Sequence, residues 1–359
     1  MDDSEVVTRL LRYLASAFDC PDIAYAEAPA RIGGGRDAAI FGFALQGTPQ
    51  AISGPLILRL NRSRVGADRV KLEAIVHNWL AAQQYACPDV RATGTDPLLL
   101  GGVFTVMTRL PGRPLAHAIE RIVGDGPFIA RARALLQVQG ILGDIIDAWV
   151  DMQIRLHTLD PAPLLAAVGA GGLDPAIITF EGQLNWIVST VDQYSLVGLK
   201  PAVDWLIAHR PSPALRTVIC HGDFHPLNIL AQNGKVTGVI DWGNIVIAPA
   251  EMDVGSAIAN IATVPFGVPR ALEFALRIFF TRILRRYQRT YAQRRALDGD
   301  AVRYFQVFRC AYQLASVLRS RAAGGHQSGA FDSAAGVNNL VRHIRAISGV
   351  SVDGMTNRT

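Results

Sequence analysis

The sequence lacks the features of a secreted, disulfide-stabilised or membrane-spanning protein. Its 359 residues include only four cysteines and no CxxC pair, so neither a disulfide framework nor a cysteine-based metal site is expected. The N-terminal segment has no basic region followed by an apolar run, so no signal peptide is expected. No apolar stretch approaches the roughly 18 residues that a membrane span requires. We therefore expect a cytoplasmic protein without a membrane span.

The composition favours a folded chain with a large core. Half of the residues are hydrophobic and 18% are charged, which excludes a disordered or fibrous protein. The formal net charge of +5 suits a site that holds phosphate but does not indicate a nucleic-acid partner. Much of the basic excess falls in residues 277–295, where we expect an amphipathic helix with a solvated basic face. A contact with an anion or a membrane surface is the alternative, and the oligomeric state is not indicated.

The first part of the chain predicts an antiparallel sheet with one inserted helix. Residues 4–18 have helical periodicity, with Ser4 available as the N-cap. A glycine cluster then separates two strand-like runs at 30–45. A strand carrying Arg59, an amphipathic helix and a further strand follow, at 54–61, 66–84 and 101–112.

Beyond Pro111 the pattern becomes mainly helical. One long helix, or two joined helices, is expected over 128–159, followed by a loop at 160–177. Further helices are expected at 182–194, at 199–210 and through most of 251–347. Three short strands interrupt them at 217–220, 228–232 and 235–240, with Asn233–Gly234 as the turn of a hairpin. The whole pattern predicts an α+β protein with an N-lobe at 1–110, a hinge near 109–113 and a C-lobe at 111–359.

An unusual concentration of polar groups lies among these short strands. "HGDFHPLN" (221–228) precedes the hairpin and "IDWG" (240–243) closes it, so Asp241 returns to the edge that holds Asp223 and Asn228. Oxygen ligands of this kind suit Mg²⁺, and a remaining carboxylate can accept a proton from a hydroxyl. One asparagine and two aspartates in this order are the residues that phosphoryl transfer uses.

"HGDFHPLN" and "IDWG" resemble the catalytic and metal-binding motifs of the aminoglycoside phosphotransferase/choline kinase family, small-molecule relatives of protein kinases. The resemblance covers roughly residues 20–260 and implies a two-lobed kinase-like fold. It implies that Asp223 is the catalytic base and that Asn228 and Asp241 bind Mg²⁺. His221 is then a structural residue of the loop, while His225 either packs the loop or touches the substrate.

The N-lobe carries further parts of the same pattern in the expected order. A kinase-like lobe needs a glycine loop, a cation on the third strand and a helical carboxylate that holds the cation. By resemblance, these correspond to Gly33–Gly34–Gly35, Arg59 and Glu73, which would bind ATP. Arginine replaces the lysine of most kinases, but it can still hold phosphate oxygens and a carboxylate. The resemblance also implies that backbone groups of Thr108 and Leu110 bind the adenine edge.

The sequence departs from the family pattern just after "IDWG". The segment "APA" at 248–250 replaces a GDP-type tripeptide, which puts the local turn geometry in doubt. Asp253 keeps the expected spacing from Asp241. We therefore expect Asp253 to brace the catalytic loop by accepting hydrogen bonds from its backbone.

The expected activity is ATP- and Mg²⁺-dependent phosphorylation of a small-molecule hydroxyl. The alternatives are an inactive nucleotide-binding module of the same fold and a metallohydrolase using His221, Asp223 and His225. The acceptor stays open between an aminoglycoside, a more apolar antibiotic such as a macrolide, and a metabolic alcohol, amino alcohol or sugar. A polycationic acceptor would need an acidic pocket, for which the available helical carboxylates are Asp144, Asp147, Asp151, Asp192 and Asp204.

Overall fold

The computed structural model describes residues 2–35, 38–61, 66–117, 128–324 and 330–353; at 33–35, 128–138 and 270–271 it describes the backbone alone. The chain divides into two compact units. The first comprises Met1–Gly112, Ala162–Asp174 and Leu230–Trp242, and the second comprises Arg113–Pro161, Pro175–Ile229 and Gly243–Thr359. The first unit therefore includes two segments from later in the chain.

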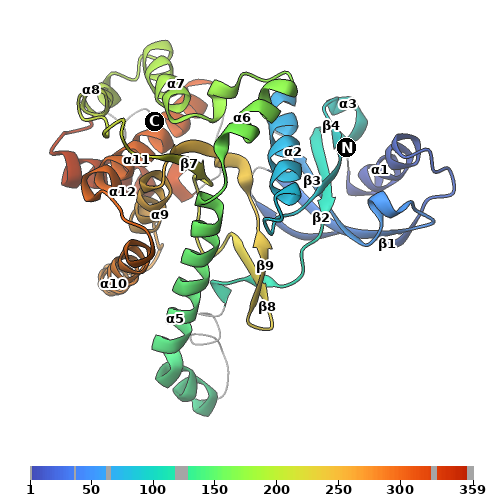
Figure 1. The fold of residues 1–359 in the computed structure, drawn as a ribbon, viewed down its shortest axis with the longest axis horizontal. Coiled ribbons are helices and arrows are strands. Elements are labelled where there is room, and N and C mark those ends of the chain that lie inside the picture. The colour runs from blue at the N-terminus through green and yellow to red at the C-terminus, as the bar shows by residue number, and fades with distance from the viewer. Residues whose placement is uncertain (1, 36–37, 62–65, 118–127, 325–329, 354–359) are drawn as a thin grey trace. The chain divides into compact units, whose positions relative to one another are not determined.

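An antiparallel sheet with the strand order β1-β2-β3-β5-β4 forms the centre of the first unit (Figure 1). Its strands are β1 (Ala24–Gly35), β2 (Ala38–Gln46), β3 (Pro55–Asn61), β4 (Val90–Gly94) and β5 (Val103–Thr108). The helices of this unit are α1 (Asp3–Ala17), α2 (Ala67–Ala82), α3 (Pro97–Leu100) and α6 (Pro161–Ala170). The hairpin strands are β8 (Ile229–Gln232) and β9 (Lys235–Val239).

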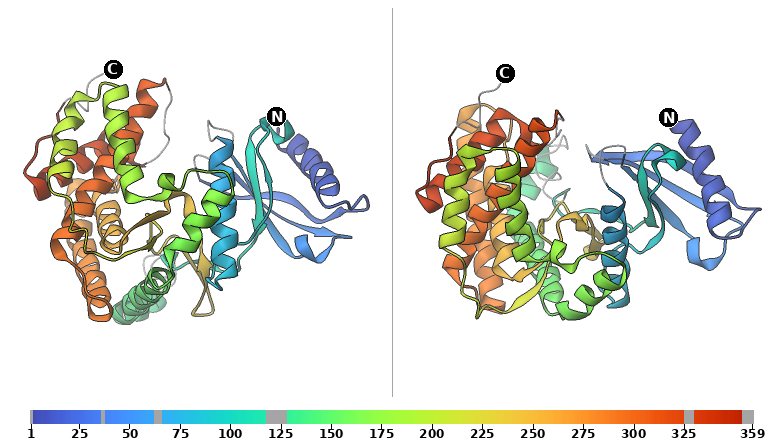
Figure 2. Two further views of the ribbon diagram at one scale, coloured as in Figure 1. Left: turned by 45° about the horizontal axis from the view of Figure 1, so that its top comes forward. Right: turned by 90° about the horizontal axis from the view of Figure 1, so that it is seen from above.

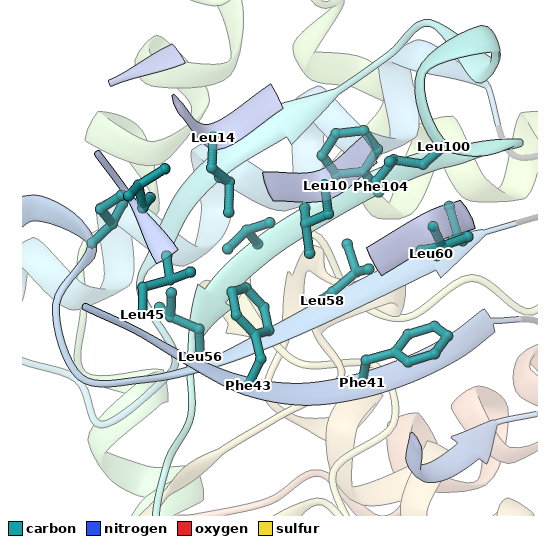
Figure 3. Packing of buried hydrophobic residues seen from close by; sticks show 14 residues of the cluster. Leu10, Leu14, Phe41, Phe43, Leu45, Leu56, Leu58, Leu60, Leu100 and Phe104 are labelled. Carbon is teal, nitrogen blue, oxygen red and sulfur yellow. The ribbon is translucent and has the colours of Figure 1, made fainter. Parts of the chain in front are cut away.

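The alternation of side chains along β3 decides which of them face the apolar core of the first unit. Successive strand residues point to opposite faces. Leu56, Leu58 and Leu60 are fully buried in one apolar cluster with Leu10 and Leu14 of α1 (Figure 3). Their neighbour in the alternation, Arg59, therefore projects from the other face, where α2 supplies its partner. The packing of the leucines in the core therefore fixes the direction in which the Arg59 side chain points.

The second unit is mainly helical. Its helices are α5 (Phe128–His157), α7 (Phe180–Gln193), α8 (Lys200–Ala208), α9 (Glu251–Thr263), α10 (Arg270–Arg294), α11 (Gly299–Ala322) and α12 (Ala334–Ser348). Its strands β7 (Thr217–Cys220) and β10 (Val246–Pro249) pair antiparallel, and β6 (Arg113–Pro114) ends beside Leu115, whose N–H donates to the Ile229 oxygen. Figure 2 shows α11, in orange, packed beside α12, in red, and α11 also packs on α9.

Two local expectations are wrong. Asp2, not Ser4, caps α1, since its side chain accepts a hydrogen bond from the Glu5 N–H at 2.8 Å. The expected loop at 160–177 contains α6, which Pro161 begins with a backbone angle already suited to a helix. Of the two alternatives for 128–159, the single long helix is confirmed as α5. Among the described residues, no helix combines the length and the apolar character needed to cross a membrane.

Candidate active site

The loop from His221 to Asn228 connects β7 to β8 and carries the polar groups of the second unit. It turns sharply at Gly222, whose φ of +78° lies in the left-handed region. A Cβ at this position would overlap the carbonyl oxygen of Asn244. Any residue other than glycine would therefore clash with Asn244 and would also strain the backbone. The glycine of "HGD" therefore makes the turn that presents the following aspartate.

Asp253, in the first turn of α9, holds this loop. Its carboxylate is wholly buried and accepts hydrogen bonds from the backbone N–H of His221 at 2.9 Å and of Gly222 at 2.6 Å. The expected bracing role of Asp253 is confirmed. The "APA" segment ends β10, which pairs with β7 and leads directly into α9, so the replaced tripeptide leaves the brace in place.

His157 supports the same carboxylate from α5. Its Nε2 lies 3.0 Å from Asp253 Oδ2, and its Nδ1 lies 2.6 Å from the Tyr291 hydroxyl. Since a carboxylate only accepts hydrogen bonds, Nε2 is the donor to Asp253. His157 therefore has a structural role.

One cluster of metal-ligand types occurs in the part of the chain that the structure describes, and it is this brace. It joins His157 and Asp253 to Cys220. Burial raises the pKa of the Cys220 thiol well above its usual value, so sulfur stays protonated, and it lies within weak hydrogen-bond distance of two backbone carbonyls. The triad that a metallohydrolase would need at His221, Asp223 and His225 does not form such a cluster. His221 Nδ1 instead accepts from the Asp223 N–H at 3.3 Å.

The Asp223 carboxylate is held through one oxygen. Asn260 of α9 donates its Nδ2 to Oδ1 at 2.6 Å, and His225 Nε2 lies 3.3 Å from the same oxygen. Arg309 of α11 places Nη2 3.8 Å from it. Burial alone would raise the pKa of Asp223, but the hydrogen bond and charge of His225 and then the charge of Arg309 outweigh it, so this pKa falls well below its usual value.

Asn228 lies beside Asp223 with its amide oriented. Its Nδ2 donates to the backbone oxygen of Asp223 at 3.0 Å, which directs the side-chain carbonyl oxygen elsewhere. That oxygen is the atom a hard cation such as Mg²⁺ would take. The second unit therefore brings together two of the expected residues, Asp223 and Asn228. Asn260 and Arg309 carry no sequence motif, and the sequence reasoning missed them.

The first unit brings together the expected cation and two carboxylates. Arg59 Nη1 lies 2.7 Å from Glu73 Oε1 of α2, and Arg59 Nη2 lies 3.6 Å from Asp241 Oδ1 at the end of the hairpin. Glu73 is buried, whereas about half of the Asp241 side chain is exposed. Asp241 also has a φ of +67°, a rare backbone conformation outside glycine that tends to occur at functional sites.

The other expected nucleotide-binding residues lie in the same sheet. Gly33, Gly34 and Gly35 end β1 and pair with β2, and residues 36–37 lie outside the described residues. Thr108 ends β5, and its N–H donates to the Asp89 oxygen at 2.9 Å. This N–H is therefore not available to adenine here, which leaves the Thr108 carbonyl and Leu110 for that expectation.

The comparison with protein-family models decides the family. A model described as "Phosphotransferase enzyme family" matches residues 31–297, well over half of the chain. The chain belongs to the phosphotransferase enzyme family. The family, the kinase-like α+β fold and the enzyme class expected from the two motifs are thereby confirmed, and the chain is a small-molecule kinase by class.

Solved structures of phosphotransferases share this fold at low sequence identity. A thermostable variant of aminoglycoside phosphotransferase APH(4)-Ia in complex with ADP and hygromycin B is 16% identical, with a TM-score of 0.55 over 95% of this chain and 99% of that one. An aminoglycoside-3'-phosphotransferase of type VIII is 18% identical, with a TM-score of 0.53 over 86% and 99%. A GDP complex of an aminoglycoside 2'-phosphotransferase IIIa variant is 15% identical, with a TM-score of 0.56 over 96% and 97%.

Proposed function

We propose that this phosphotransferase transfers the γ-phosphoryl group of ATP to a hydroxyl group of a small molecule, with Mg²⁺ as the metal. The observation that carries the proposal is the braced loop, which holds Asp223 and Asn228 side by side through Asp253. Relatives that bind ADP or GDP support a nucleotide as the phosphoryl donor.

The first unit supplies groups that suit nucleotide phosphates. The guanidinium of Arg59 has five N–H donors in a planar fork, and Glu73 accepts from Nη1 at 2.7 Å. The second terminal nitrogen faces Asp241 at 3.6 Å, a distance too long for a strong hydrogen bond. We assign Arg59 to phosphate binding, Glu73 to its orientation, and the backbone of Gly33, Gly34 and Gly35 to the cover of the phosphates.

The second unit supplies the group that handles the acceptor. We assign Asp223 to orient the acceptor hydroxyl and to take its proton. The hydroxyl oxygen forms a bond to the γ-phosphorus, the bond from that phosphorus to the β,γ-bridging oxygen breaks, and ADP leaves with the electron pair. The proton of the hydroxyl ends on Asp223. The Thr108 carbonyl and the Leu110 backbone are assigned to the adenine edge.

Asn228 and Asp241 are the proposed ligands of Mg²⁺. Both offer oxygen donors, which this hard cation prefers. The amide of Asn228 is oriented by its bond to the Asp223 backbone, and the Asp241 carboxylate is accessible, so the donor set fits the ion. Mg²⁺, when bound, neutralises charge on the phosphate oxygens.

The charges of the second unit disfavour a polycationic acceptor. Of the five aspartates that could have formed an acidic pocket, Asp147 and Asp151 pair with Arg294, and Asp204 pairs with Lys200 at 3.4 Å. The remaining two, Asp144 and Asp192, are exposed on helix surfaces. Carboxylates neutralised by nearby cations do not attract amines, so this acidic set does not support an aminoglycoside.

A cavity near the C-terminal end of α9 favours an acceptor with an apolar face. Its volume is about 630 Å³, within the range typical of small-molecule sites. Its lining includes Phe266 and Phe274, while its carboxylate, Glu273, is tied to Arg277 at 2.6 Å. Arg342 adds a further positive charge. We propose that a neutral or acidic hydroxyl compound with an apolar surface binds here.

The test is nucleotide consumption measured with ATP and with GTP, at varied Mg²⁺, over a panel of hydroxyl compounds. The panel contains aminoglycosides, macrolides, amino alcohols, sugars and hydroxy acids. We expect an acceptor-dependent rate that Asp223→Asn abolishes while nucleotide binding by calorimetry is retained. Asp204→Asn, a surface change on α8, is the matched control and should keep the rate.

Three outcomes would overturn the proposal. Absence of nucleotide binding would exclude a kinase, and binding without turnover of any compound would indicate an inactive nucleotide-binding module. Turnover that requires zinc or manganese but no nucleotide would indicate a metallohydrolase. Preferential turnover of aminoglycosides would leave the kinase intact but overturn the proposed acceptor class.

A further inference from the structure

Two residues from helices outside the sequence motifs converge on Asp223. Asn260 lies near the C-terminal end of α9, and Arg309 lies near the middle of α11. Asn260 donates Nδ2 to Asp223 Oδ1 at 2.6 Å and accepts at Oδ1 from Arg309 Nε at 3.0 Å. The three side chains therefore form a continuous hydrogen-bonded series from Arg309 through Asn260 to the proposed base.

We propose that Asn260 and Arg309 are positioning residues that lock the Asp223 carboxylate in one orientation for the attack of the acceptor hydroxyl. This inference rests on the proposed function, since it assigns Asp223 the role of handling the hydroxyl proton. Neither residue has to touch the acceptor or the nucleotide for this role.

The chemistry of an amide explains why an asparagine lies between the other two. A primary amide both donates and accepts, so it can link an arginine, which only donates, to a carboxylate, which only accepts. A flip of the Asn260 amide would place its NH₂ group against the guanidinium and its oxygen against Asp223. Arg309 therefore fixes which end of Asn260 faces the carboxylate, and the order of the chain follows.

The Arg309 side chain is buried, so its positive charge needs a nearby negative charge. Only 5% of its side chain is exposed, and its guanidinium also lies over the Tyr312 ring at 5.9 Å. A buried cation is costly unless a counter-charge lies near, and Asp223 Oδ1 lies 3.8 Å from Nη2. Because arginine does not deprotonate in proteins, this charge stays in place throughout turnover.

The two carboxylate oxygens of Asp223 have different surroundings. In the described part of the chain, its three side-chain contacts, with Asn260, His225 and Arg309, all go to Oδ1. Oδ2 is left as the acceptor for the hydroxyl. A loose phosphoryl-transfer transition state needs the attacking oxygen aligned more than strongly deprotonated, so the orientation of Oδ2 matters more than its basicity.

The first test removes the NH₂ group of Asn260 while preserving the shape of the side chain. Asn260→Asp keeps a partner for Arg309 but places a carboxylate against Asp223, and we expect Asp223 to rotate away. We expect kcat to fall about 10- to 100-fold, the equivalent of one charge-assisted hydrogen bond, with the KM values for nucleotide and acceptor nearly unchanged. Gln306→Glu is the matched control, since Gln306 is also a buried amide but lies on α11, and its amide bonds to the Val302 oxygen and to His343.

The second test restores the cation chemically. Arg309→Ala should lose kcat to a similar extent, because Asn260 loses the group that orients its amide. Millimolar guanidinium should recover part of that rate by entering the vacated space, and Arg309→Lys should retain more rate than Arg309→Ala. Arg321→Ala, which removes an arginine paired with Asp332, should need no rescue and show none.

The proposal is overturned if Asn260→Asp retains the wild-type kcat, or if Gln306→Glu loses as much kcat as Asn260→Asp. Crystal structures of wild type and Asn260→Asp provide a reading that needs no turnover. If the Asp223 carboxylate has the same orientation in both structures, Asn260 does not hold it and the proposal is overturned. A rotated carboxylate in Asn260→Asp would support the proposal. If the wild-type protein binds no nucleotide, the proposed function fails while this structural comparison still decides the lock.

Discussion

Substitution of Asp253 by asparagine gives the sharpest test of how the catalytic loop is held. The two carboxylate oxygens accept three hydrogen bonds, from the N–H of Gly222 at 2.6 Å, from the N–H of His221 at 2.9 Å and from His157 Nε2 at 3.0 Å. The side chain is fully buried, so water cannot replace any of them. The asparagine has the same shape but only one oxygen.

The expected loss follows from the two ways in which the amide can lie. With its NH₂ group at the Oδ1 position, it meets the Gly222 N–H; at the Oδ2 position, it meets the His221 N–H and His157. Either orientation loses at least one charge-assisted hydrogen bond, about 1.5–3 kcal/mol, and leaves a buried donor unsatisfied, about 1–3 kcal/mol. We expect the free energy of unfolding to fall by about 3–5 kcal/mol, as for other broken buried charge contacts.

Urea unfolding followed by far-UV circular dichroism measures this change. The matched control is Asp204→Asn, an exposed aspartate paired with Lys200, for which a change within about 0.5 kcal/mol is expected. The acceptor-dependent rate of Asp253→Asn should fall together with stability, because the loop carries Asp223. A loss below about 1 kcal/mol, or one equal to that of the control, would refute the view that Asp253 holds the loop.

Arg59→Ala should weaken ATP binding about 10- to 100-fold in calorimetry, the loss of one charge-assisted contact, while Arg59→Lys should lose less because it keeps the charge. An unchanged Kd in Arg59→Ala would contradict its assignment to phosphate. His343 tests pH dependence: burial lowers its pKa to about 4. The unfolded chain then takes up a proton first as pH falls, so the free energy of unfolding should decrease by up to about 3 kcal/mol between pH 6.5 and 4. His343→Gln should remove that slope in urea unfolding, and an identical slope in the variant would contradict this.

The parts of the site with strong local signals were accessible from the sequence. The hairpin turn at Asn233–Gly234 has positive φ at both residues, +52° and +76°, as its composition predicts. The neighbouring strands β7, β8 and β9 match their expected positions within one or two residues. Asp253 could be placed by its spacing from Asp241 in the sequence.

Elements that depend on distant partners were not accessible in the same way. The strand β10, "VIAP", contains a proline and is defined by its pairing with β7, more than twenty residues earlier. The strand β4 is short and acquires its identity from β5. Such strands are set by tertiary pairing and have little intrinsic preference of their own. The same reason hides Asn260 and Arg309, whose helices bring them to Asp223 without any local motif.

The arginine at position 59 is more than a tolerated replacement for lysine. Its two terminal nitrogens point to different carboxylates of the first unit, Glu73 on α2 and Asp241 at the end of the hairpin. A lysine has all of its donors on one nitrogen, whereas the planar guanidinium presents a separate nitrogen to each carboxylate. Nucleotide phosphate would compete with Asp241 for the outer nitrogen, because that contact is the longer of the two. Phosphate binding would then release Asp241 from Arg59 at the moment when the proposed metal ligand is needed.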